Sequence, residues 1–101
     1  METYTFTDME KGKIVSSLIL YTVKLPSRYL GVIEEVKTDL EYRRQGRATR
    51  LMKQAIAKGK ELGLDCIELT VREDNPAVQE FYKSLGFFDR LNRAYRLVIG
   101  V

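Results

Sequence analysis

Hydrophobic and polar positions alternate in the first part of the chain. Residues 2–7 (ETYTFT) alternate and are rich in threonine and aromatic side chains, and residues 13–24 and 29–38 are longer segments rich in β-branched residues. A period of two residues with this composition is typical of β-strands. The turn residues Gly12 and Pro26 separate the three segments. The pattern predicts an antiparallel meander of three strands with short connections.

The period changes to that of a helix after residue 45. Over residues 46–62, apolar side chains recur at three- and four-residue intervals, at Ala48, Leu51, Met52, Ala55, Ile56 and Leu62. This spacing predicts an amphipathic helix, and Gly63 suits the position just past its end. Residues 65–71 (DCIELTV) predict a short buried strand. Residues 29–38 and 65–71 are therefore expected to be parallel neighbours, joined by a right-handed crossover.

A second helix and a hairpin complete the expected order. Asn75 and Pro76 are a helix-start signal, because Asn caps a helix well and Pro suits its first position. An apolar stripe follows at Val78, Phe81, Tyr82 and Leu85, and Gly86 ends the helix. Residues 87–100 hold two short apolar runs around a polar turn, which predicts a final hairpin. The order β-β-β-α-β-α-β-β predicts a mixed α+β fold, with a mostly antiparallel sheet and a central parallel βαβ crossover.

The composition limits the chemistry that the chain can perform. Its 101 residues, 45% of them hydrophobic, are expected to form a single domain over residues 1–101. It has no histidine and one cysteine, Cys66. A Ser-His-Asp or Cys-His nucleophilic site is therefore excluded, and we expect no metal site. Proton transfer is left to Glu, Asp, Lys, Tyr or water. We expect Cys66 to be a packing residue.

The sequence favours a reduced cytoplasmic environment. The stretch METYTFTDME lacks the basic head and apolar region of a secretory signal, and the longest apolar run, residues 18–21, is too short to span a membrane. A single cysteine permits no internal disulfide. We expect no membrane partner.

Residues 42–49 (YRRQGRAT) pack three arginines around one glycine, just before the first predicted helix. A helix start offers unpaired backbone N–H groups and a positive dipole end, which together bind phosphate. Gly46 permits close approach of an anion, and the first turn carries no acid. A solvated basic helix start and a nucleic-acid contact are the alternatives. The net charge of +3 fits a phosphate ligand without requiring one.

A second stretch, residues 75–87 (NPAVQEFYKSLGF), sharpens this interpretation. Taken with residues 33–48, it resembles the GNAT superfamily of N-acyltransferases. Arg43, Gly46 and Ala48 match that family's [QR]-x-x-G-x-[GA] motif. The second motif is matched by Asn75, Ala77, Phe81, Tyr82, Gly86 and Phe87. The resemblance covers roughly residues 10–100 and implies transfer of an acyl group, most simply acetyl from acetyl-CoA, to a primary amine in a ternary complex.

The resemblance also implies roles for single residues. The backbone of Gln45 to Thr49 would hold the CoA diphosphate, and the backbone of the strand end would pair with pantetheine. Tyr82 would protonate the departing thiolate. Asn75 would cap its helix and contact the ligand. The expected cofactor-binding residues are thus Val36, Lys37, Thr38, Arg43, Arg44, Gln45, Gly46, Arg47, Ala48, Thr49, Asn75 and Tyr82.

Plainer interpretations stand beside these roles. Tyr82 also belongs to the apolar stripe, and the Val36 side chain suits a core position. Glu34 and Glu35 are candidate general bases, directly or through water, for the acceptor amine. Adjacent strand residues point to opposite faces, so one of the two is expected to face the cleft and both equally suit a polar sheet face.

The chain departs from the family pattern at its start, where the family's first strand and first two helices have no counterpart. Three consequences follow as expectations: an open acceptor site suited to a protein or peptide, a second subunit that completes the site, or CoA binding without efficient transfer. The sheet edge left exposed favours a homodimer. A CoA-binding module without catalysis is the alternative function, and a nucleic-acid binder is the weaker one.

Overall fold

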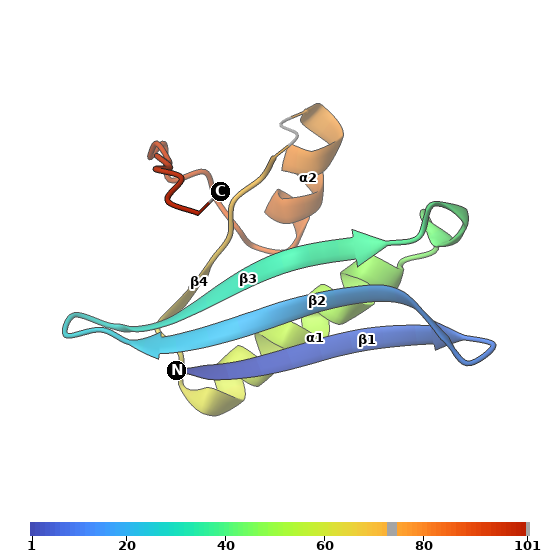
Figure 1. The fold of residues 1–101 in the computed structure, drawn as a ribbon, viewed down its shortest axis with the longest axis horizontal. Coiled ribbons are helices and arrows are strands. Elements are labelled where there is room, and N and C mark those ends of the chain that lie inside the picture. Colours follow the sequence, from blue (N-terminus) through green and yellow to red (C-terminus); the bar gives the residue numbers. More distant parts are fainter. Residues whose placement is uncertain (73–74, 101) are drawn as a thin grey trace.

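The computed structural model describes residues 1–72 and 75–100. Three long strands form the meander: β1 (Glu2–Glu10), β2 (Lys13–Lys24) and β3 (Tyr29–Thr38). A short 3-10 helix, η1 (Leu40–Tyr42), follows, and then α1 (Arg47–Leu62), β4 (Cys66–Glu68) and α2 (Pro76–Ser84). The sheet order is β1-β2-β3-β4, antiparallel except for the parallel pair β3–β4 (Figure 1). The expected α+β fold with a parallel crossover is confirmed.

The first strand is longer than its sequence pattern indicated. It runs to Glu10 rather than to residue 7, and the hairpin turn is only Lys11 and Gly12. Both turn residues have positive φ angles, of 50° and 77°, which is the geometry that lets a two-residue turn follow the twist of its strands. As a result, Asp8 and Glu10 belong to the sheet and not to a solvated loop.

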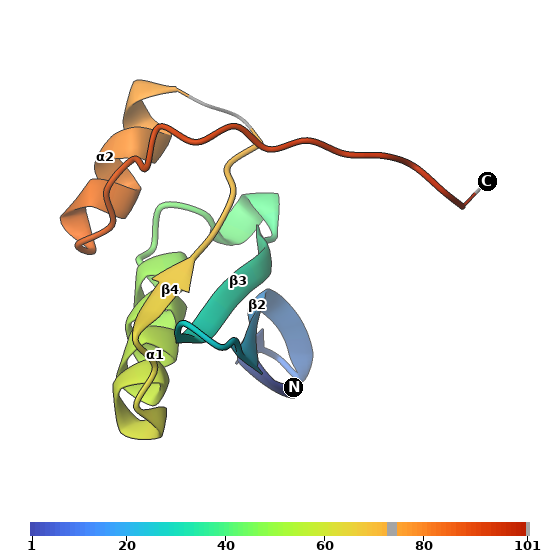
Figure 2. The ribbon, with the colours of Figure 1, turned by 90° about the vertical axis from the view of Figure 1, so that its left-hand side faces the viewer.

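The core lies between the sheet and α1. Six residues with at most 2% of their surface exposed form it: Leu18, Leu20, Ile33, Leu51, Met52 and Ala55. Figure 2 shows α1 packed along one face of the sheet, with α2 above its N-terminal end. Gly59 permits the close contact between α1 and β4, because a Cβ there would lie 2.9 Å from Ile67 Cδ1. No helix in the described residues is long and apolar enough to cross a membrane.

The predicted C-terminal hairpin is wrong. Residues 87–100 form no strand, and Figure 2 shows them as an extended segment that leaves the body of the protein. Hydrophobic side chains in this segment are largely exposed, among them Tyr95 at 90% and Ile99 at 87%. Two apolar runs suffice for strand propensity, but a strand also needs a partner strand, and residues 87–100 pair with no strand of the described sheet. The predicted strand over residues 65–71 is likewise shorter, at Cys66–Glu68.

Candidate active site

The start of α1 carries free backbone donors. Gly46 caps the helix in the left-handed region, at φ 75°, and no side chain in the described chain caps the first turn. That turn contains no acidic residue. A non-glycine residue would strain this backbone, whereas a Cβ at Gly46 would meet no other atom within 4 Å. The N–H groups of the first turn therefore face open space, as a phosphate site at a helix start requires.

The two arginines before Gly46 are exposed and differ in their contacts. Arg43 donates through Nε to the Thr38 carbonyl at 3.1 Å, which ties the loop to the end of β3. Arg44 has a φ angle of 62°, an unusual value for a residue with a side chain, and it makes no ion pair in the described part of the chain. Arg44 is thus available to an anion.

The side chains of Arg47 and Arg50 reach carboxylates of β1. Arg47 donates to Asp8 Oδ2 at 2.9 Å and to Glu10 Oε1 at 2.7 Å, and Arg50 also contacts Asp8. Desolvation works against the Asp8 charge, but the hydrogen bonds and positive charges of Arg47 and Arg50 outweigh it, so the pKa of Asp8 is lowered. The side chains of Arg47 and Arg50 therefore have a structural role, because they join α1 to β1.

The end of β3 forms the second part of the site. β3 and β4 pair only from Leu30 to Val32 and from Cys66 to Glu68, and Figure 1 shows the chain leaving β3 beyond β4. The next segment of β3 therefore has no strand partner on that side within the described residues. The Lys37 carbonyl accepts from the Ser16 hydroxyl at 3.0 Å, and the Thr38 carbonyl accepts from Arg43. Val36 packs against the core.

A β-bulge changes the expected placement of the two glutamates. Ile19 pairs with Glu34 and Ser17 with Lys37, so β3 holds one more residue than β2 between these pairs. Glu35, with a φ angle of 54°, lies within this interval. Both Ile33 and Val36 contact the core, which simple alternation does not allow. Simple alternation therefore does not hold across Glu34 and Glu35, and both side chains are exposed.

α2 brings the candidate acid to the same end of the sheet. The Asn75 side chain accepts from the Val78 N–H at 2.9 Å, which confirms its capping role. Tyr82 is half-buried, and its ring centroid lies 5.0 Å from that of Phe81 and 6.0 Å from that of Phe87. Burial raises the pKa of the Tyr82 phenol. The phenol is therefore protonated at neutral pH, as a proton donor must be.

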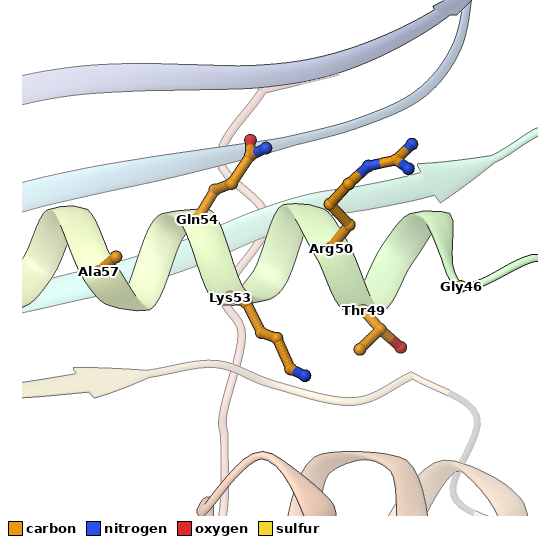
Figure 3. Close-up of a pocket in the computed structure, with 6 residues that line it drawn as sticks. All are labelled: Gly46, Thr49, Arg50, Lys53, Gln54 and Ala57. Carbon is orange, nitrogen blue, oxygen red and sulfur yellow. The ribbon is translucent and has the colours of Figure 1, made fainter.

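A shallow hollow of about 580 Å³ runs along α1 from its first turn. Its lining residues are Gly46, Thr49, Arg50, Lys53, Gln54 and Ala57. Figure 3 shows Thr49 and Lys53 pointing toward the side of β4 and α2, and Arg50 and Gln54 pointing toward β1 and β2. A smaller hollow of about 290 Å³ continues to Ser84 and Leu85 on α2. The surface beside the helix start is thus concave and basic.

The family model of the GNAT acetyltransferases matches residues 2–87. The chain belongs to this family. Its relatives include N-alpha-acetyltransferase 30 of Schizosaccharomyces pombe, which is 40% identical over 94 residues, 92% of this chain and 62% of that protein. An uncharacterized N-acetyltransferase of Methanocaldococcus jannaschii is 35% identical over 66 residues, 65% of this chain and 29% of that protein.

Solved structures agree with this assignment. The crystal structure of a Trypanosoma brucei acetyltransferase superposes with a TM-score of 0.79 at 27% identity, over 96% of this chain and 68% of that one. The GNAT chain described here spans less than two thirds of the length of the two curated relatives.

Sequence reasoning missed two residues of this GNAT site, Asp8 and Glu10. The alternating pattern identified in the first segment ends at residue 7, so neither acid is predicted to lie on a strand. Continued by three residues, it places both acids on the face of Tyr4 and Phe6, which pack against the core. Acidic residues on an inner face require cationic partners, so the signal was present in the sequence.

Proposed function

We propose that this GNAT chain is an acyl-CoA-dependent N-acyltransferase that transfers acetyl from acetyl-CoA to a primary amine. The start of α1 is the observation that carries the proposal. Gly46, at the N-cap position, has a left-handed backbone, and no side chain accepts a hydrogen bond from the first turn. That turn contains no acidic residue and lies next to the exposed Arg44. A CoA diphosphate, doubly charged and narrow, suits such a set of backbone donors. Family membership supports acyl transfer in general.

The residues of the site divide into a binding set and a reacting set. Backbone N–H groups from Gln45 to Thr49, with Arg43 and Arg44 beside them, would hold the diphosphate. The backbone from Val36 to Thr38 would pair with pantetheine where β3 lacks a strand neighbour. Asn75, which starts α2, would border the ligand. The thioester supplied by acetyl-CoA would then lie near the β3 bulge and α2.

In the proposed reaction, the acceptor nitrogen forms a bond to the thioester carbonyl carbon and the carbon–sulfur bond breaks. Tyr82 donates its phenolic proton to the departing sulfur, for which burial keeps it protonated. Glu34 or Glu35 accepts the proton from the amine, directly or through water. Both carboxylates are exposed at the bulge, within reach of solvent. No covalent enzyme intermediate is required.

The name of one relative supports a choice of acceptor. That relative is named as an N-alpha-acetyltransferase. We therefore propose the α-amino group of a polypeptide as the first acceptor to test. Small amines and lysine side chains are the comparison acceptors.

The experiment is thermal unfolding of the protein with acetyl-CoA, free CoA or a short DNA duplex, because a ligand that binds only the native state raises the midpoint. We expect a shift with both CoA species and none with DNA. Release of free thiol in the presence of peptides with free N-termini then measures transfer. Binding without thiol release would indicate a CoA-binding module, and a shift with DNA alone would reject the proposal.

We further propose a cytoplasmic homodimer. β1 lies at one edge of the described sheet, with β2 as its only strand neighbour there, and its outer edge offers backbone groups for pairing with a second copy. Analytical sedimentation tests the dimer. A monomer at high protein concentration would contradict it.

A further inference from the structure

The side chains of Arg47 and Arg50 form a compact charge cluster with Asp8 and Glu10. The two terminal nitrogens of Arg47 bind different carboxylates, Asp8 at 2.9 Å and Glu10 at 2.7 Å. Its Nε donates to the Gln45 side chain at 2.9 Å, and its guanidinium lies 5.0 Å from the centre of the Tyr42 ring. The Arg47 side chain is 12% exposed and that of Asp8 17%. At this burial, the pair of Arg47 with Asp8 is stronger than an ion pair on a solvated surface.

This cluster joins segments that lie far apart in the sequence. Asp8 and Glu10 come from the end of β1, whereas Arg47 and Arg50 come from the first turn of α1. The loop between β3 and α1 is therefore anchored at both ends, because Arg43 ties its beginning to Thr38. Between the two anchors, Arg44 and Gly46 have left-handed backbone conformations. Such conformations persist when the surrounding contacts enforce them.

We propose that Asp8 and Glu10 are positioning residues for the acyl-CoA diphosphate. The inference rests on the proposed function. The two carboxylates hold Arg47 and Arg50 on the β1 side of α1 and so fix the first turn of the helix, whose N–H groups point out of the helix start at Gly46. They neutralise two cations of the cluster, which leaves the backbone and Arg44 to meet the anion. Neither carboxylate needs to touch the ligand.

Positioning and simple electrostatics predict opposite results. A carboxylate near an anion repels it, so removal of Asp8 and Glu10 on charge alone would tighten CoA binding. If the two acids position the loop, their removal weakens binding, because misplaced donors lose their geometry toward the diphosphate. The sign of the change therefore separates the two explanations.

The test compares the double variant Asp8→Asn/Glu10→Gln with the parent chain. Free CoA affinity is measured by calorimetry, and KM and kcat for acetyl-CoA by thiol release, at a temperature where circular dichroism shows both proteins folded. We expect Kd and KM to rise about tenfold or more, with kcat changed less than about twofold. Unchanged or tighter CoA binding would overturn the proposal. Glu61→Gln is the control, because it removes a carboxylate that pairs with Lys58 at the far end of α1.

Arg47→Lys is the second variant, and it keeps the test valid if the double variant does not fold. Lysine retains the charge but cannot reach two carboxylates with one planar group. Positioning predicts weaker CoA binding in this variant, whereas a direct charge contact with phosphate predicts little change. If the parent chain binds no CoA, the proposed function fails. If the parent binds CoA and both variants bind it equally well, only the positioning role fails.

Discussion

At the scale of single residues, Tyr82 combines a packing role with the proposed role of catalytic acid. Its ring belongs to the apolar contact between α2 and the core, with Phe81 and Phe87 against it. The motif alone suggested an acid and the periodicity alone suggested a packing residue. The structure shows that the packing role exists, and burial raises the pKa of the phenol. The two roles are compatible, since burial keeps the proton on the oxygen.

Replacing Tyr82 with Phe tests the acid. The ring contacts are kept and only the hydroxyl is lost, so we expect kcat to fall about 10²-fold or more while CoA affinity changes little. Because the pKa is raised above the ordinary phenol value of about 10, the parent should keep its acid function up to at least that pH. Thiol release, measured as a function of pH, gives both kcat and the pH range over which the acid functions. Tyr95→Phe, at an exposed phenol, is the control, and equal turnover in the Tyr82 variant would remove Tyr82 as the acid.

Asp8 predicts a pH dependence of stability. Its pKa is lower in the folded chain than the unfolded value of about 3.9, because Arg47 and Arg50 outweigh its desolvation. The stability that its charge contributes is thus complete above the unfolded pKa and is lost as the pH falls through the folded one. Urea unfolding should show Asp8→Asn less stable than the parent at pH 7, with the difference shrinking below about pH 4.

A matched substitution checks that this effect belongs to the cluster. Asp39→Asn removes an exposed carboxylate 3.5 Å from Lys13 and should change stability little at either pH. A difference between the parent and Asp8→Asn that does not shrink as the pH falls below about 4 would contradict the assignment of the effect to charge.

At the scale of elements, the bounds of β2, β3 and α1 could be predicted closely, because each carries a long, regular pattern. The bulge in β3 could not, because it depends on the register with β2 and not on the sequence of β3 alone. It places Val36 on the core face and leaves the two glutamates exposed. The candidate bases were therefore identified correctly as polar residues of one strand, but their directions required the paired strand.

The two ends of α1 offer a matched prediction. Gly46 and Gly63 have nearly equal φ angles, of 75° and 78°, and a Cβ at either would meet no atom within 4 Å. Alanine at either position should therefore cost about 1 kcal/mol of stability from backbone strain. Only Gly46→Ala should also weaken CoA binding, since only that end faces the proposed diphosphate. Urea unfolding and calorimetry give the two quantities, and equal CoA affinities in both variants would reject the diphosphate site at Gly46.

At the scale of the whole molecule, stability resides in the contact between sheet and α1, and the C-terminal segment adds little to it. Leu18, Leu20 and Met52 are fully buried, whereas Leu97 and Ile99 are 84% and 87% exposed. The apolar pattern of the tail resembles that of a strand, but beyond Phe87, which packs against the core, its hydrophobic side chains are largely exposed. Arg90 also forms an ion pair with Glu68, at 2.8 Å.

This distribution predicts unequal costs for apolar substitutions. Leu20→Ala should lower the unfolding free energy by about 2–5 kcal/mol, because it leaves a cavity in the core. Leu97→Ser with Ile99→Ser should change it by less than about 0.5 kcal/mol. Chemical unfolding of the three proteins measures both. A large loss in the tail variant would show that the tail packs in solution, against this chain or a second copy.

The sequence by itself determined the order of elements through α2, the Gly63 and Asn75 helix ends and the two GNAT motifs, because periodicity, glycine and proline signals and motif spacing are local properties. It did not determine the inward acids of β1, the bulge at Glu35 or the unpaired tail. Each of these depends on a partner that lies far away in the chain. The arginines of YRRQGRAT show the difference most clearly. Their charge was evident at once, but only the tertiary contact with Asp8 and Glu10 decided which of them remain available to an anion.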